Sequence, residues 1–200
     1  RALPQMNDVP GLECKDKRRN ADWWLHSYGL YCLDVDGTGR DFITPYMDVK
    51  TLEAFCAVAQ MVNYTQYKAL VEGYTQQMWS DAPGELPIAT GFLIWKTQNP
   101  WPGLRGSLYD WWLDQNGGYF GVKQATQPVH AQLDLRTGEI VLVNVSRQPR
   151  TVSFTATVYD LAGNTGTAVS GAANVPAMSY HRAGAAPGPG GAPVWFLRLE

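Results

Sequence analysis

Apolar residues recur at steps of three and four positions along residues 48–79. The recurring positions include Leu52, Phe55 and Ala59. Because an α-helix completes a turn every 3.6 residues, this spacing places them on one face and predicts a long helix with an apolar stripe toward a core. Residues 1–47 show no sustained period and are rich in proline, glycine and aspartate, so we expect an irregular segment there.

A short run that is apolar on both faces follows at residues 91–96. Such a run is typical of a strand in a parallel sheet, because helices cover both sides of that kind of sheet. A loop with proline and glycine separates it from a second predicted helix at residues 107–116, in which Trp111 and Trp112 are expected to pack. The order helix, strand, loop, helix predicts a segment of a barrel of alternating strands and helices.

The pattern changes to that of short β-strands after Pro128. Segments rich in valine, threonine and phenylalanine are separated by turn sequences at a spacing of about ten residues. This spacing predicts a β-sandwich over residues 129–200, truncated at its C-terminus. We therefore predict an α+β composite, in which residues 1–128 hold the last strand and helices of a (β/α)8 barrel and an immunoglobulin-like β-sandwich follows. His130 opens the sandwich, and we expect it to serve the junction between the domains.

Charge and composition exclude several classes of partner. The 200 residues are 45% hydrophobic and 17% charged, with a formal net charge of −2, so the chain can bury a core and has no electrostatic reason to bind nucleic acid or an anionic membrane. Its apolar runs are far shorter than the roughly 20 residues that cross a bilayer, and no signal peptide is visible. We expect a soluble protein of unassigned location, with Arg1 and Glu200 marking cuts through a longer chain.

The cysteines and the sequons carry no defined chemistry. Cys14, Cys32 and Cys56 lack metal-ligand spacing. Cys56 falls in the predicted helix and is expected to be a buried thiol, whereas a disulfide between the other two stays open. Asn63 and Asn144 each begin a sequon, and whether either carries a glycan also stays open.

One acidic loop begins like a calcium site. It runs from Asp34 to Pro45 and offers oxygen atoms at its first, third and fifth positions, with glycine at the sixth. Its twelfth position is Pro45 instead of a bidentate glutamate, and its eighth is Asp41 instead of an apolar residue. An ordinary acidic turn explains this loop better. We predict neither a metal nor a cofactor for the chain.

Residues 91–130 carry the most specific motifs of the chain. They contain Gly-hydrophobic-Ile-Trp, then Asn-Pro-Trp, Tyr-Asp, Gly-Tyr-Phe-Gly and Pro-hydrophobic-His-hydrophobic-Gln. In this order they closely resemble glycoside hydrolase family 2, specifically its exo-β-glucosaminidase and plant endo-β-mannosidase branch. Residues 96–101 and 103–106 look like the plant mannosidase version. The resemblance covers residues 48–200, and residues 1–47 match poorly.

The resemblance implies a retaining glycosidase whose catalytic groups lie elsewhere. Such an enzyme needs two carboxyl groups about 5 Å apart, and in the family these are glutamates at the ends of barrel strands four and seven. This chain would begin after strand seven, and a whole barrel takes about 250 residues, so we predict no catalytic residue in it and no activity alone. Its partners would be the glycan substrate and the missing N-terminal part of the enzyme, in cis or as a subunit.

Substrate contact is the role that remains for this chain. Active sites of such barrels lie at the C-terminal ends of the strands, which positions residues 95–101 beside the sugar. We predict that Trp95 and Trp101 contact the sugar ring and that Gln98 and Asn99 bind its hydroxyls. Two other interpretations stay open: both tryptophans could be core residues, and the chain could be a non-catalytic carbohydrate-binding or structural module. The choice between a mannoside and a glucosaminide, and between endo and exo action, also stays open.

Overall fold

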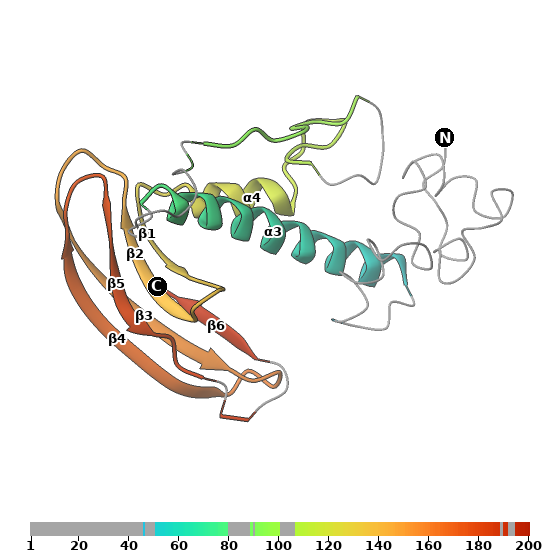
Figure 1. Cartoon of the computed structure of the whole chain (residues 1–200). Coiled ribbons are helices and arrows are strands. Elements are labelled where there is room, and N and C mark those ends of the chain that lie inside the picture. Colours follow the sequence, from blue (N-terminus) through green and yellow to red (C-terminus); the bar gives the residue numbers. More distant parts are fainter. Residues whose placement is uncertain are drawn as a thin grey trace, which may run out of the picture. The chain divides into compact units, whose positions relative to one another are not determined.

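The computed structural model describes residues 46, 51–79, 89, 91–100, 107–188, 190–191 and 195–200. These residues form an α+β fold with antiparallel sheets (Figure 1). The elements are α3 (Leu52–Gln77), α4 (Gly117–Ala125), β1 (Val129–Leu133), β2 (Glu139–Asn144), β3 (Arg150–Tyr159), β4 (Thr165–Val175), β5 (Ser179–Ala185) and β6 (Phe196–Leu199). The chain divides into two compact units, with breaks after Leu70, Phe92 and Gln124.

Several predictions of the sequence fall outside the described residues. The irregular segment at residues 1–47 is described only at Tyr46. The open Cys14–Cys32 pair and the acidic loop that starts at Asp34 therefore lie outside the described part. Within that part, no group of three or more histidine, cysteine or carboxylate side chains could hold a metal ion. None of the helices described here has the length and apolar character required to cross a membrane.

Helix α3 occupies most of the segment that the apolar spacing marks as helical. Thr51 precedes it, and its Oγ1 accepts a hydrogen bond from the backbone N–H of Ala54 at 3.2 Å, as a capping residue does. Phe55 and Val62 are buried. Cys56 was expected to be buried but is exposed, because adjacent helix positions lie about 100° apart and Cys56 therefore points away from the face that buries Phe55.

Helix α4 approaches α3 through its glycines, and Figure 1 shows the two helices side by side. A Cβ atom at Gly121 would lie only 2.3 Å from the carbonyl oxygen of Tyr64, and one at Gly117 would lie 2.1 Å from that of Gln60. The backbone N–H of Gly117 donates to Gln60 Oε1 at 2.6 Å. The two backbones are thus close enough that only glycine fits at these positions of α4.

Asparagine side chains hold the start of α4 in place. Asn116 precedes the helix, and its Oδ1 accepts from the backbone N–H of Tyr119 at 3.3 Å, which caps the first turn. The Nδ2 group of Asn63, on α3, donates to the same Oδ1 at 3.2 Å and to the carbonyl oxygen of Ser107 at 3.3 Å. The amide nitrogen that a glycan would modify in the first sequon is therefore engaged inside the fold.

The second unit contains two three-stranded antiparallel sheets, ordered β1-β2-β5 and β4-β3-β6. In the first sheet His130 pairs with Val143. In the second, β3 is central and pairs with β4 and β6. One hydrophobic core draws on strands of both sheets, and its buried members are Ile140, Leu142, Val152, Phe154, Ala156 and Val175.

Asn144, at the end of β2, closes one end of this core. It is fully buried, and its Nδ2 group lies within 2.8–3.1 Å of the carbonyl oxygens of Gln148, Val175 and Pro176. Its Oδ1 accepts from the backbone N–H and the hydroxyl of Ser146 at 3.0 and 2.6 Å. This asparagine satisfies buried backbone groups, so the second sequon is also built into the fold.

Candidate functional site

Residues 91–96, predicted as a buried strand, form no regular secondary structure. A strand of a parallel sheet needs hydrogen-bonded neighbouring strands, and no strand of the described residues pairs with this segment. Phe92 does contact a helix, because its ring stacks on Tyr74 of α3 with the ring centroids 5.1 Å apart. Two of its apolar side chains are uncovered, since Leu93 is 100% exposed and Trp95 is 87% exposed, whereas Phe92 and Ile94 are half-buried. The peptide bond that follows Trp95 is cis.

The loop after Trp95 is fixed against the segment that begins at Ser107. The carbonyl oxygen of Thr97 accepts from the backbone N–H groups of Leu108 and Tyr109 at 3.0 and 2.9 Å. Gln98 forms a parallel bridge with Tyr109 and is exposed. These backbone bonds hold residues 97–98 in a defined place at the surface of this unit.

Asn99 differs from Gln98 because its side chain is directed inward. It is only 3% exposed, and its Nδ2 donates to Ser107 Oγ at 3.5 Å. Ser107 Oγ in turn donates to the carbonyl oxygen of Tyr109 at 2.8 Å. The amide of Asn99 thus anchors the loop. Trp101, the fourth predicted contact residue, lies outside the described residues.

The helix predicted at residues 107–116 does not form, and the helix of this region is α4. The reason lies in Asp110, whose Oδ1 accepts from the backbone N–H groups of Trp112 and Asp114 at 2.8 and 2.9 Å. A short polar side chain that takes these donors competes with the helix for them. Leu113 has a positive φ of 69°, which also ends any right-handed helix. Trp112 is consequently exposed, and the packing expected for it is wrong.

A buried contact between Glu72 and His130 joins α3 to the sheets within the second unit. The sequence indicates a role for His130 but not for Glu72. His130 Nε2, on β1, lies 2.6 Å from Glu72 Oε1, on the last turns of α3, and both residues are buried. Gln132, on the same strand, donates from Nε2 to the carbonyl oxygen of Glu72 at 3.0 Å. His130 therefore links β1 to the last turns of α3 within the second unit. Its expected role at the junction between the two domains stays a prediction.

Asp134, just after β1, gathers donors from three parts of the second unit. Its Oδ1 accepts from the backbone N–H groups of Arg136 and Thr137 at 2.9 and 3.3 Å. Its Oδ2 accepts from Gln76 Nε2, on α3, and lies 3.4 Å from a guanidinium nitrogen of Arg182, on β5. Burial alone would raise the pKa of Asp134, but hydrogen bonds from Arg136, Gln76 and Thr137 outweigh it and lower the pKa to about 2.

Asp134 should make the stability of this unit depend on acid. Because its pKa is lowered on folding, the carboxylate stabilises the folded state above the unfolded pKa of about 3.9, and this stabilisation is lost as the pH falls toward 2. We expect Asp134→Asn to lower the free energy of unfolding by on the order of 1–2 kcal/mol at pH 7 and by almost nothing at pH 2. Urea unfolding between pH 2 and 7 measures this difference. A gap that stays constant with pH would contradict it, and the exposed Asp114→Asn is the control.

Comparison with known proteins places the relatives of this chain among the glycoside hydrolases, although no protein-family model matches it. Over 145 residues, or 72% of the chain, it is 43% identical to mannosylglycoprotein endo-β-mannosidase of Lilium longiflorum. Over 113 residues, or 56% of the chain, it is 30% identical to exo-β-D-glucosaminidase of Amycolatopsis orientalis. The resemblance to this branch of glycoside hydrolase family 2 is thereby confirmed.

Two solved structures of glycosidases have a fold similar to that of this chain. The exo-chitosanase CsxA of Amycolatopsis orientalis matches 81% of the chain with a TM-score of 0.71 and 24% identity. A β-D-mannosidase from Dictyoglomus thermophilum matches 92% of the chain with a TM-score of 0.59 and 15% identity. The chain spans only a small share of these proteins: 14% of the lily enzyme, 11% of the glucosaminidase, 19% of CsxA and 22% of the mannosidase structure.

Proposed function

We propose that this chain is part of a retaining glycoside hydrolase that cleaves β-mannosidic or β-glucosaminidic bonds, and that it forms one wall of the sugar subsite. In this proposal residues 1–128 belong to a (β/α)8 barrel, and residues 129–200 form an immunoglobulin-like sandwich. The names of the relatives and the two antiparallel sheets around one core support this assignment.

The exposure of Trp95 carries the proposal. A tryptophan that is 87% exposed, next to a fully exposed Leu93, leaves a large apolar area in water unless something covers it. We propose that neighbouring barrel elements cover Leu93 and that the sugar ring covers Trp95. The C–H groups on one face of a pyranose suit an indole ring, and the exposed Gln98 can bond a hydroxyl. We propose a positioning role for Asn99, while contact by Trp101 stays a prediction.

The catalytic carboxylates belong, in this proposal, to a part of the enzyme beyond these 200 residues. A barrel alone takes about 250 residues, and the relatives are several times longer than this chain. The glycan is the substrate, and the remainder of the barrel is the partner, in the same polypeptide or as a subunit. We expect no hydrolysis of an aryl β-mannoside or a Man-β-GlcNAc glycan by the 200-residue chain, and turnover by it would overturn this point.

Replacing Trp95 by alanine in the complete enzyme should reduce kcat/KM by about 50-fold or more. Loss of the stacking surface then removes about 2 kcal/mol of transition-state binding. Because the side chain is exposed in this chain, the melting temperature of the 200-residue protein should stay nearly unchanged. Steady-state kinetics with an aryl β-mannoside and thermal unfolding measure the two effects.

The exposed Trp112, in the turn after Asp110, offers a matched control. Trp112→Ala removes an equally large aromatic group of the same unit and should leave kcat/KM within about two-fold of its original value. A large loss of stability in Trp95→Ala, with unchanged kinetics, would show that Trp95 is a core residue of the complete enzyme and would refute the proposed contact.

A further inference from the structure

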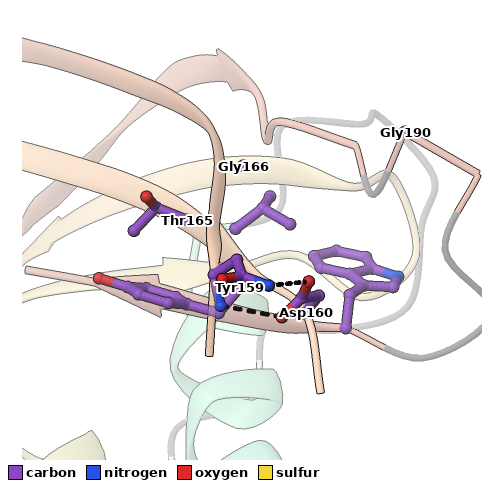
Figure 2. Close-up of a pocket in the computed structure, with 8 residues that line it drawn as sticks. Tyr159, Asp160, Thr165, Gly166 and Gly190 are labelled. Atoms are coloured by element: carbon purple, nitrogen blue, oxygen red, sulfur yellow. Dashed lines mark hydrogen bonds between the residues drawn. The ribbon is translucent and has the colours of Figure 1, made fainter. Parts of the chain in front are cut away.

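A separate pocket lies on the second unit, where β3 ends and β4 and β6 begin. It has a volume of about 240 Å³. Figure 2 shows Tyr159, Asp160 and Thr165 beside one another at its base, with Gly190 above them. Asn164 and the half-buried Trp195 also line it. The pocket thus combines one indole ring with several polar groups.

The polar side of the pocket is a turn held together by hydrogen bonds to Asp160. Asp160 Oδ1 accepts from the backbone N–H groups of Ala162 and Asn164, both at 2.9 Å. Asp160 Oδ2 accepts from Asn164 Nδ2, also at 2.9 Å. The side-chain and backbone hydrogen bonds from Asn164 lower the pKa of Asp160, so its carboxylate is ionised at neutral pH.

These bonds leave hydrogen-bonding capacity toward the pocket. A carboxylate oxygen can accept about two hydrogen bonds, so Asp160 Oδ2 has one site left, and the Oδ1 atom of Asn164 is a further acceptor. Thr165 is exposed and adds a hydroxyl. A set dominated by acceptors and bearing one negative charge favours a ligand that brings donors and disfavours an anion.

We propose that this pocket binds one pyranose ring of a neutral glycan, with the C–H face of the ring on Trp195 and its hydroxyls donating to Asp160 and Asn164. The volume of the pocket is below the roughly 300–1,000 Å³ of pockets for drug-sized molecules. A single sugar ring is smaller than such molecules, so the size of the pocket agrees with this ligand. The choice of a glycan rests on the proposed function. The site is nevertheless distinct from Trp95, since all of its residues belong to the second unit.

We expect a single pyranose ring to bind weakly at this site. A single ring of about 12 non-hydrogen atoms with ordinary ligand efficiency gives a dissociation constant near 1 mM. A weak site of this kind can hold a distant sugar unit of a long glycan while the enzyme acts elsewhere on the same chain. Each such contact raises the affinity for the whole glycan, because the second binding event is intramolecular.

The test is a titration of the 200-residue chain with β-1,4-mannotriose, followed by two-dimensional NMR of backbone amides and tryptophan side chains. We expect saturable shifts at Asn164, Thr165 and the Trp195 indole, with a dissociation constant of about 1 mM. Trp195→Ala should weaken binding at least ten-fold, and Thr165→Ala, which removes only an exposed hydroxyl, should weaken it about three-fold. Trigalacturonic acid should bind at least ten-fold more weakly than mannotriose.

Trp95→Ala distinguishes this pocket from the proposed catalytic subsite. It should leave the shifts at Asn164 and Thr165 unchanged, whatever it does to kcat/KM in the complete enzyme. An unchanged dissociation constant in both Trp195→Ala and Thr165→Ala would overturn the pocket proposal, and so would no saturation up to about 50 mM sugar. Either result would leave the kinetic test of Trp95 intact.

Discussion

Replacing Gly121 by alanine should separate α4 from α3 and lower the free energy of unfolding of the first unit by about 3 kcal/mol. The new Cβ atom would lie 2.3 Å from the carbonyl oxygen of Tyr64 and 3.2 Å from the backbone nitrogen of Lys68. Both contacts are with backbone atoms, which cannot rotate away as a side chain can, so the cost lies at the upper end of the range for overpacking. Thermal and urea unfolding followed by circular dichroism measure the loss.

The direction of the stability change in Gly121→Ala tests whether α3 and α4 are in close contact. In a helix without such a contact, alanine is more favourable than glycine by about 1 kcal/mol. A Cβ atom added at Gly73, in α3, would meet no other atom within 4 Å, so Gly73→Ala should stabilise the protein by about 0.5–1 kcal/mol. If Gly121→Ala is also stabilising, the close approach of α3 and α4 is incorrect.

The local sequence predicts α3 and β3 well because their apolar patterns are repeated over many residues, whereas it does not predict β5. The spacing of Phe55 and Val62 continues along α3, and the alternation in β3 buries Val152, Phe154 and Ala156 in turn. Because the pattern is repeated, one residue that departs from it, such as the exposed Cys56, does not change the predicted bounds of the helix. Periodicity therefore accounts for α3 and β3 but not for every strand, since β2 is buried along nearly its whole length and β4 is exposed along most of its length.

Elements that depend on single side chains could not be predicted in this way. The apolar content of residues 107–116 favours a helix, but Asp110 alone takes two backbone donors and makes a turn instead. The true helix, α4, begins with two glycines, which are poor helix formers. Its position becomes understandable only from contacts with Gln60 and Tyr64, which are more than fifty residues away in the chain.

The candidate site also contains residues that a local motif predicts and residues whose position depends on distant partners. Trp95 and Gln98 were expected near the sugar from a local motif, and both are exposed. The inward direction of Asn99 depends on Ser107, a partner beyond the loop. The pocket around Trp195 joins a turn to a residue from a later loop, so no single stretch of sequence contains it. The nearest local signal is the sequence Asp-Leu-Ala-Gly-Asn, which marks a turn but not a pocket.

The second large effect is expected at the buried contact between Glu72 and His130. His130→Ala should lower the free energy of unfolding by about 3 kcal/mol, because it removes the buried imidazole that lies 2.6 Å from Glu72 Oε1. His181, on β5, is exposed, so His181→Ala should change stability by less than about 0.5 kcal/mol. Urea unfolding of both variants at pH 7 provides the comparison.

A double-mutant cycle shows whether the loss comes from the pair or from packing. Replacing both Glu72 and His130 by leucine removes the two polar groups together, and buried pairs exchanged for apolar residues often lose little stability. We expect the double variant to be more stable than either single leucine variant by at least about 1 kcal/mol. If the two single losses simply add, the contact does not couple α3 to β1. If the cycle shows coupling, the last turns of α3 are held to the sheets by this pair, and the second unit includes them.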